Sequence, residues 1–232
     1  MTPSAPPGRL IGAGRAADVY ELGQGRVLRR YRVPFDVAPE ARLMTYLREA
    51  GFPVPEVFDA DGTDLVMARL NGADMLADLA GRPWRAARHA TALAALHDRL
   101  HEIPAPPDLP GRFGDGGRVL HMDLHPGNVM LTGGGPVVID WSNAVAGPPG
   151  ADVAMAALIM RTSEVDDLRA PARLAVGLVR SLVVRRFESA VGADPGPYLA
   201  QVAEFRLHDP NVRAAEADRL REIIRTAPGP GR

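Results

Sequence analysis

The 232-residue sequence predicts an α+β fold in two parts, a small antiparallel β-sheet with one helix followed by a mainly helical region. Residues 10–70 have the pattern of short strands separated by Gly-containing turns, with one helical segment among them. From about residue 74 onward the pattern is mostly helical, interrupted by short hairpins. Residues 1–9 and 227–232 are rich in Pro and Gly, so we expect disordered tails there.

A glycine-rich loop connects the first two predicted strands. Its pattern, G-x-G-x-x-A-x-V, is formed by Gly12, Gly14, Ala17 and Val19. Small residues allow a backbone to approach phosphate groups closely, and backbone N–H groups bind anions. A dinucleotide-binding loop has the same glycines but needs a helix directly after it, whereas residues 18–22 and 23–25 predict a strand and a turn. Taken alone, the segment favours a Gly-rich hairpin without a ligand.

The return strand, residues 26–31, places two arginines on opposite faces. Alternation puts Val27 and Arg29 on one face and Arg30 on the other. Arg pairs bidentately with phosphate oxygens, although its planar head is bulkier than the ammonium of Lys. A solvent-exposed basic strand is the alternative interpretation of these residues.

A helix is predicted over residues 39–50, with Gly51 as its stop. The apolar residues within about 60° of Glu40 on such a helix are Leu43, Met44 and Leu47. Glu40 should therefore point with the apolar face, where a carboxylate needs a cationic partner. The alternative is a partly exposed first-turn Glu that the helix dipole favours.

Two further strands and a linker complete the first part. Residues 54–58 and 64–67 predict strands that meet at an Asp61–Gly62 hairpin. The segment 66–70 follows and ends at the turn signal Asn71–Gly72. It is the predicted hinge between the two parts.

The most informative segment is His121-Met-Asp-Leu-His-Pro-Gly-Asn128, followed by Val137-Val-Ile-Asp140-Trp141. Short strands on either side of a Thr132–Gly135 turn would return Asp140 beside the first loop. Protein kinases have an Asp and an Asn at the spacing of Asp123 and Asn128, and a second Asp after a strand, and use them for phosphoryl transfer. The pattern therefore predicts a phosphoryl-transfer centre.

Together with Gly147-Pro-Pro-Gly-Ala-Asp152-Val-Ala154, this block resembles the aminoglycoside phosphotransferase and choline kinase-like family. That family shares the protein kinase fold, and the similarity runs from about Ile11 to about Arg161. The resemblance implies a two-lobed protein kinase-like fold. Its nucleotide-binding lobe would be residues 10–70, and its lobe with the catalytic loop and the acceptor site residues 71–226.

The resemblance also implies a role for individual residues. Asp123 would orient the accepting hydroxyl and take its proton, while Asn128 and Asp140 would hold Mg²⁺. Arg29 would stand where the family has Lys, and would pair with Glu40. The residues implied at the nucleotide are Gly12, Gly14, Ala17, Val19, Val27, Arg29, Glu40, Met67 and Ala68.

The neighbouring residues are implied as supports of the catalytic loop. His121 would organise the loop from a buried position, and Asp152 would tie the loop to the start of a helix. The role of His125 stays open between a structural residue and one that contacts substrate or phosphate.

The implied activity is that of a small-molecule kinase, which transfers the γ-phosphoryl group of ATP or GTP to a hydroxyl of a small acceptor. A pseudokinase that binds nucleotide or serves as a scaffold is the alternative, motivated by the missing Lys, by Ala17 at the third glycine position and by the short C-terminal part. The acceptor is not readable. Residues 151–232 hold eleven Asp and Glu against twelve Arg, a balance that disfavours polycationic aminoglycosides.

Composition narrows the chemistry further. All 27 basic residues are Arg, which excludes a Walker A loop, a Schiff-base Lys and a Lys general base. The absence of Cys excludes disulfides, thiolate catalysis and Cys-ligated zinc. The net charge of -1 gives no overall attraction to nucleic acid or to a membrane surface, so neither partner is expected. A nucleic-acid-binding protein is a further alternative, but the richness in Arg is its only support and the net charge opposes it. Without a long apolar run or a signal-peptide pattern, the cytoplasm is the expected location.

Two remaining features are given structural interpretations. His97 and His101 have the i, i+4 spacing of metal ligands, but no clear third ligand accompanies them. Trp84 and the methionines are interpreted as packing residues.

Overall fold

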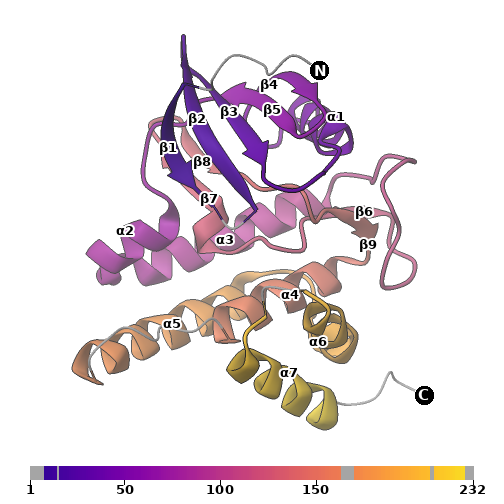
Figure 1. The fold of residues 1–232 in the computed structure, drawn as a ribbon. Coiled ribbons are helices and arrows are strands. Elements are labelled where there is room, and N and C mark those ends of the chain that lie inside the picture. The colour runs from indigo at the N-terminus through magenta and orange to yellow at the C-terminus, as the bar shows by residue number, and fades with distance from the viewer. Residues whose placement is uncertain (1–7, 15, 163–169, 210–211, 228–232) are drawn as a thin grey trace. The chain divides into compact units, whose positions relative to one another are not determined.

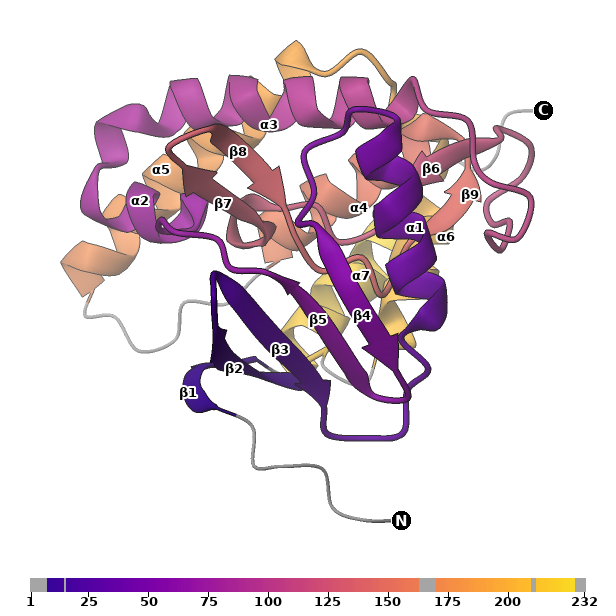
Figure 2. The same cartoon turned by 90° about the horizontal axis from the view of Figure 1, so that it is seen from above.

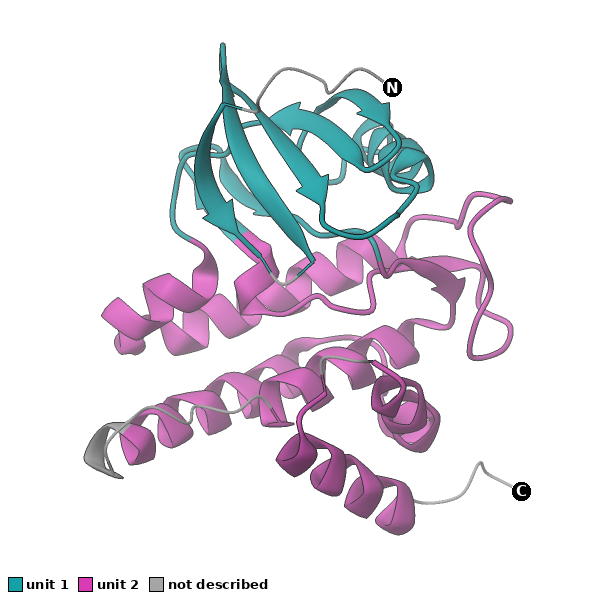
Figure 3. Ribbon diagram, viewed as in Figure 1, with its two compact units in different colours: residues 1–73, 130–142 teal, residues 74–129, 143–232 magenta. Residues whose placement is uncertain are grey.

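A computed structural model describes residues 8–14, 16–162, 170–209 and 212–227, and the chain divides into two compact units (Figures 1 and 3). The first unit is residues 1–73 and 130–142, and the second is residues 74–129 and 143–232. Most of the expected tails, residues 1–7 and 228–232, lies outside the described residues. Arg9, expected in the N-terminal tail, instead begins a strand because it pairs with Glu21.

The first unit contains a five-stranded antiparallel sheet in the order β1-β2-β3-β5-β4, with one helix inserted between β3 and β4 (Figure 2). Its elements are β1 (Arg9–Ala13), β2 (Ala17–Gly23), β3 (Arg26–Tyr31), α1 (Ala38–Glu49), β4 (Val57–Asp61) and β5 (Asp64–Ala68). The glycine-rich loop is the β1–β2 hairpin and no helix follows it, so the dinucleotide-binding alternative is wrong. The predicted return strand is confirmed over the same residues.

Helix α1 buries the face that the sequence predicts. Glu40, Leu43, Met44 and Leu47 are all buried, and Glu49 is exposed. The helix ends before Gly51, whose φ of 79° is in the left-handed region that Gly adopts without strain. The predicted helix is therefore confirmed to within one residue at each end.

The fourth strand lies three residues later than predicted. It was expected over 54–58 and is formed by Val57–Asp61. Pro53 and Pro55 cannot donate to a ladder, so this apolar stretch stays outside the sheet although it has strand-like composition. The β4–β5 turn is correspondingly made by Gly62 and Thr63, because Asp61 pairs directly with Asp64.

A second hairpin, β7 (Val129–Thr132) and β8 (Gly135–Val138), lies almost entirely in the first unit, although it follows the catalytic loop in sequence. The N–H of Leu131 donates to the Ala73 carbonyl at 2.9 Å, and the N–H of Val138 donates to the Pro53 carbonyl at 2.8 Å. These two bonds attach the hairpin to the connections around the sheet. They place the residues after β8 within the first unit.

The second unit is mainly helical. Its elements are α2 (Met75–Gly81), η1 (Pro83–Arg85), α3 (Ala86–His101), β6 (Arg118–Leu120), η2 (Pro126–Asn128), β9 (Val145–Gly147), α4 (Pro149–Thr162), α5 (Ala170–Ala190), η3 (Gly196–Tyr198), α6 (Leu199–Leu207) and α7 (Ala214–Thr226). Helix α3 packs along α5, α4 contacts α5 and α6, and α6 packs on α7. The apolar residues of α4 form a core with Leu120, Val202 and Leu220.

One packing interpretation is wrong. Trp84 is 76% exposed in the short η1 turn, because this turn is too short to bury its side chain against a neighbouring element. Among the described residues, no helix combines the length and the apolarity needed to cross a membrane.

Candidate active site

Asp123 is held in the second unit by Asn128. The Asn128 amide nitrogen donates both to the Asp123 carbonyl and to the carboxylate oxygen Oδ2, at 2.9 Å in each case. The short η2 turn brings Asn128 back toward Asp123, since the N–H of Asn128 donates to the His125 carbonyl. The carboxylate is therefore fixed in orientation while about a fifth of its side chain, 21%, stays exposed.

The two histidines of the loop have different positions. His121 is fully buried, and its Nδ1 accepts from the N–H of Asp123 at 3.2 Å. His125 is partly exposed, and its Nδ1 accepts from the N–H of Gly127 at 3.0 Å. The His125 Nε2 lies 3.7 Å from Asp123 Oδ1. Both rings thus shape the loop backbone, and His125 also lies next to the carboxylate that we expect to handle the proton.

Asp152 anchors this loop from the start of α4. It is completely buried and accepts from His101 Nε2 at 3.0 Å, from the N–H of His121 at 3.2 Å and from the N–H of Met122 at 2.7 Å. Met122 has a φ of 61°, a left-handed conformation that costs a non-Gly residue energy. The Asp152 carboxylate therefore holds the strained residue that directly precedes Asp123.

The contact with His101 affects the ionisation of Asp152. Burial alone raises the pKa of Asp152, but its hydrogen bond to His101 and its electrostatic interactions with the surrounding histidines outweigh burial, so the pKa of Asp152 is held well below the usual range. Asp152 thus stays ionised and able to accept all three bonds at neutral pH.

Burial of His97 should make the stability of the protein depend on pH. Burial lowers the pKa of His97 to about 4, although the Asp152 carboxylate acts in the opposite direction. The folded pKa is below the unfolded one, so the unfolded chain binds more protons between these values. Stability should therefore fall as the pH falls from about 6.5 to about 4, by about 3 kcal/mol. His97→Gln should lack this part of the pH dependence in urea unfolding.

The groups that act on His97 are present both in the wild type and in His97→Gln. Asp152, His101 and His121 interact with it electrostatically, and Phe187 lies against its ring at 4.9 Å. The difference between wild type and His97→Gln therefore isolates the His97 proton. His208→Gln, at an exposed position after α6, is the matched control. A wild-type pH profile that His97→Gln reproduces would contradict the assignment.

In the first unit, Arg29 bridges two carboxylates. Its NH1 donates to Glu40 Oε1 at 2.9 Å and its NH2 donates to Asp140 Oδ1 at 2.5 Å. The Arg29 side chain is only 11% exposed, and that of Asp140 is 36% exposed. Burial lowers the pKa of Arg29, but the carboxylates of Asp140 and Glu40 outweigh it and raise the pKa overall. The inward position of Glu40 and its pairing with Arg29 are confirmed.

Three groups around this bridge are not evident from the sequence motifs. The Tyr31 hydroxyl donates to Glu40 Oε2 at 2.8 Å, and the backbone N–H of Trp141 donates to Glu40 Oε1 at 3.1 Å. The Ser142 hydroxyl donates to Asp140 Oδ1 at 3.1 Å. Strand alternation places Tyr31 on the Arg29 face and could have indicated the first contact. The backbone contact of Trp141 has no side-chain signal.

Burial raises the pKa of Glu40, even though Arg29 and Tyr31 act to lower it. The same burial, together with the negative charge of Glu40, raises the pKa of Tyr31. The hydroxyl of Tyr31 thus stays protonated and remains a donor to Glu40.

Most of the residues expected at the nucleotide share one face of the sheet. Gly12 pairs with Val19, Val19 pairs with Arg29, and Val27 pairs with Met67. Directly paired residues and residues two apart along a strand have their side chains on the same face. Ala17, two residues before Val19, belongs to this set. Gly14 lies in the β1–β2 turn, where its N–H donates to the Ala17 carbonyl, and Ala68 ends β5.

The two residues expected to hold the metal each supply a hard oxygen donor, the kind that a divalent cation prefers. Mg²⁺ takes one or two protein oxygens and completes its shell with phosphates and water. Asn128 uses its amide nitrogen for Asp123, and its Oδ1 accepts no hydrogen bond within the described ranges. Asp140 supplies a partly exposed carboxylate. In the same ranges no group of three or more His, Asp or Glu side chains is arranged to hold a metal ion.

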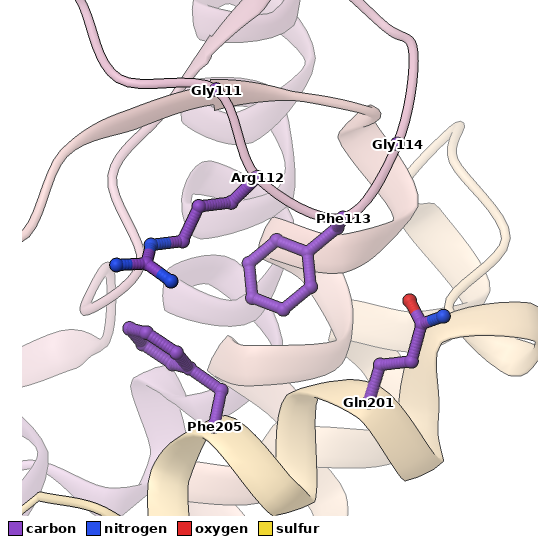
Figure 4. A pocket seen from close by; sticks show the side chains of 6 residues that line it. All are labelled: Gly111, Arg112, Phe113, Gly114, Gln201 and Phe205. Carbon is purple, nitrogen blue, oxygen red and sulfur yellow. The ribbon is translucent and has the colours of Figure 1, made fainter.

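The second unit also has an open pocket of about 430 Å³ between the segment before β6 and helix α6. Figure 4 shows Arg112 extending over Phe205, with its guanidinium carbon 5.2 Å from the ring centroid. Phe113 meets Phe205 edge-on at 5.6 Å, and Gln201 adds a carboxamide. The lining carries no carboxylate, and it offers two aromatic rings for stacking and the guanidinium of Arg112 as a donor.

Comparisons with known proteins identify the family of this chain. The sequence matches the phosphotransferase enzyme family over residues 7–118 and 115–187. A search of curated protein sequences gives no match.

Several solved structures share the fold. A choline/ethanolamine kinase family protein from Mesorhizobium loti has a TM-score of 0.58 at 17% identity, covering 96% of this chain and 89% of that one. Aminoglycoside phosphotransferase APH(4)-Ia has a TM-score of 0.62 at 16% identity, covering 95% and 93%. Ethanolamine kinase from Plasmodium vivax has a TM-score of 0.58 at 10% identity, covering 91% and 80%. The chain therefore belongs to the phosphotransferase enzyme family, the aminoglycoside phosphotransferase and choline kinase-like group that its motifs predicted, and it has the kinase-like fold of that group.

Proposed function

We propose that this small-molecule kinase uses ATP or GTP with Mg²⁺, and that Asp123 receives the proton of the acceptor hydroxyl. The observation that carries the proposal is the fixed carboxylate of Asp123, which Asn128 orients on a loop anchored by Asp152. A general base must be held in place and must reach its proton, and these contacts meet the first requirement. In a ternary complex, a mutant of APH(4)-Ia carries AMP-PNP and hygromycin B, which supports a nucleoside triphosphate as donor.

The reaction follows from the roles of these residues. The acceptor oxygen forms a bond to the γ-phosphorus, its proton passes to the Asp123 carboxylate, and the bond from the γ-phosphorus to the β–γ bridging oxygen breaks. The nucleoside diphosphate leaves with the electron pair of that bond. A bound Mg²⁺ would neutralise phosphate charge, and Asn128 and Asp140 are the residues that would hold it. The remaining donors of Arg29 are available to phosphate oxygens.

The acceptor is proposed to be a hydroxylated molecule that is not a polycation. Acidic residues and Arg are nearly balanced in residues 151–232, and the Arg112 pocket has no carboxylate. Binding of a polycation calls for a locally acidic surface, which neither feature provides. A screen of hydroxylated metabolites and antibiotics with ATP or GTP and Mg²⁺, read as nucleoside diphosphate release, tests the activity and the acceptor together. Nucleotide binding without turnover toward any acceptor would support the pseudokinase alternative.

Replacing Asp140 should separate metal binding from nucleotide binding. Asp140→Ala is expected to remove the Mg²⁺-dependent part of the affinity for AMP-PNP, because it removes the carboxylate proposed to hold the cation. Calorimetric titrations with and without Mg²⁺ measure this part directly. Asp64→Ala is the control. It also removes a carboxylate paired with an Arg of β3, but that Arg is Arg30, on the face of the strand opposite to Arg29. Equal Mg²⁺ dependence in wild type and Asp140→Ala would contradict the metal role.

A further inference from the structure

Arg29 has two different carboxylate partners and uses a different terminal nitrogen for each. NH1 is bonded to Glu40, and NH2 is bonded to Asp140, which also accepts the Ser142 hydroxyl. A Lys ammonium has one nitrogen, whereas the guanidinium is a rigid fork. Arg29 therefore makes a connection between Glu40 and Asp140 that depends on the fork.

Aromatic side chains pack against the Arg29 guanidinium. The Arg29 guanidinium carbon lies 4.8 Å from the centre of the Tyr31 ring, and the Tyr31 ring stacks on Phe35 at 4.4 Å. Tyr31 also fixes the second oxygen of Glu40. These contacts limit the movement of the guanidinium and keep its NH2 group directed at Asp140.

Asp140 is thus paired with an internal cation. The bridge itself joins two carboxylates through one guanidinium. The Ser142 hydroxyl donates to Asp140, and the Tyr31 hydroxyl and the Trp141 N–H donate to Glu40. A divalent cation that binds Asp140 has to approach a carboxylate whose Oδ1 already holds a positively charged donor. Like charges disfavour one another at such short range.

We propose that Arg29 competes with the divalent cation for the Asp140 carboxylate, so that the nucleotide-free protein binds metal weakly and metal enters mainly together with nucleotide. The proposal rests on the proposed function of Asp140 as a metal ligand. Phosphate oxygens provide alternative acceptors for the guanidinium, which has five N–H donors and uses two of them among the described residues. The nucleotide would in this way relieve the competition that Arg29 exerts.

The test is the binding of Mn²⁺ to the nucleotide-free protein, measured from the spectrum of unbound Mn²⁺. Arg29→Gln removes the positive charge and should bind Mn²⁺ about tenfold more tightly than wild type, within the range usual for coupled binding. Arg29→Lys keeps the charge but loses the fork, so it should show an intermediate gain. Arg30→Gln, which removes the neighbouring strand Arg paired with Asp64, should leave Mn²⁺ binding unchanged.

A double variant locates the effect. Asp140→Asn combined with Arg29→Gln should lose the gain, because the carboxylate that Arg29 released is then absent. Thermal unfolding of each variant shows whether it is folded, and Arg29→Lys carries the test if Arg29→Gln is not. Mn²⁺ binding to both Arg29 variants that equals the wild-type value would overturn the proposal, as would a gain that persists in the double variant.

A titration of wild type with Mn²⁺ in the presence of AMP-PNP separates this inference from the proposed function. Failure to bind Mn²⁺ with AMP-PNP would contradict the proposed function itself. Binding of Mn²⁺ with AMP-PNP, without any effect of the Arg29 variants in the nucleotide-free state, would contradict only the competition.

Discussion

Asp123→Asn is expected to reduce phosphoryl transfer by about 10²–10⁴-fold, the usual range for loss of a positioned acid–base group. Its amide oxygen can still accept the bond from Asn128 that the carboxylate accepts in the wild type. The loop geometry should therefore persist, while the proton acceptor is lost. Steady-state kinetics with the acceptor found in the screen measures the loss, and calorimetry should show nearly unchanged nucleotide affinity.

An exposed carboxylate of the same unit provides the comparison. Asp218 on α7 has a side chain that is 77% exposed and pairs with Arg221 of the same helix, so Asp218→Asn should leave the turnover unchanged. Wild-type turnover in Asp123→Asn would remove Asp123 from the mechanism. A loss of nucleotide affinity equal to the loss of turnover would instead place Asp123 at the nucleotide.

Asp152→Asn should destabilise the protein by about 3–5 kcal/mol, the range for breaking a buried charged network. The carboxylate accepts from His101 and from two backbone N–H groups, whereas an amide must turn its own donor toward at least one of them. An unsatisfied buried donor adds to the cost of the lost charge. Urea unfolding at neutral pH measures the difference.

The loop should also lose its geometry in this variant, because the N–H of Met122 loses its acceptor. Turnover should therefore fall in Asp152→Asn even at temperatures where the protein is folded. Asp98→Asn is the control, since Asp98 likewise accepts a backbone N–H, that of Gly192, but at an exposed position. A free energy of unfolding for Asp152→Asn that matches Asp98→Asn would contradict the anchoring role.

Local periodicity and turn chemistry were sufficient to predict most of the first unit. The Arg29 face of β3 and the inward face of α1 follow from spacings of two and of three to four residues, which the backbone geometry fixes within each element. The pairing of Arg29 with Glu40 could be inferred from the motif because both residues belong to it. The β4 error has a local cause, since two prolines interrupt a segment of strand-like composition.

Contacts between segments distant in sequence could not be predicted in the same way. The bond of Arg29 to Asp140 joins residues separated by 111 positions, and it depends on how the β7–β8 hairpin attaches to the connections around the sheet. The Trp141 N–H that binds Glu40 is a backbone group, so no residue type announces it. His101 could not be identified as the partner of Asp152 either, because its i, i+4 relation to His97 suggested a different pairing.

Asp140 has a φ of 69°, and a side chain in this left-handed conformation costs about 1 kcal/mol or more relative to Gly. Gly adopts this conformation without that cost, and its presence would leave Arg29 and Glu40 as a neutral pair. Asp140→Gly would remove this backbone cost but also the bonds of the carboxylate to Arg29 and Ser142. The carboxylate is therefore held in place at a cost in backbone energy, which is common for residues at functional sites.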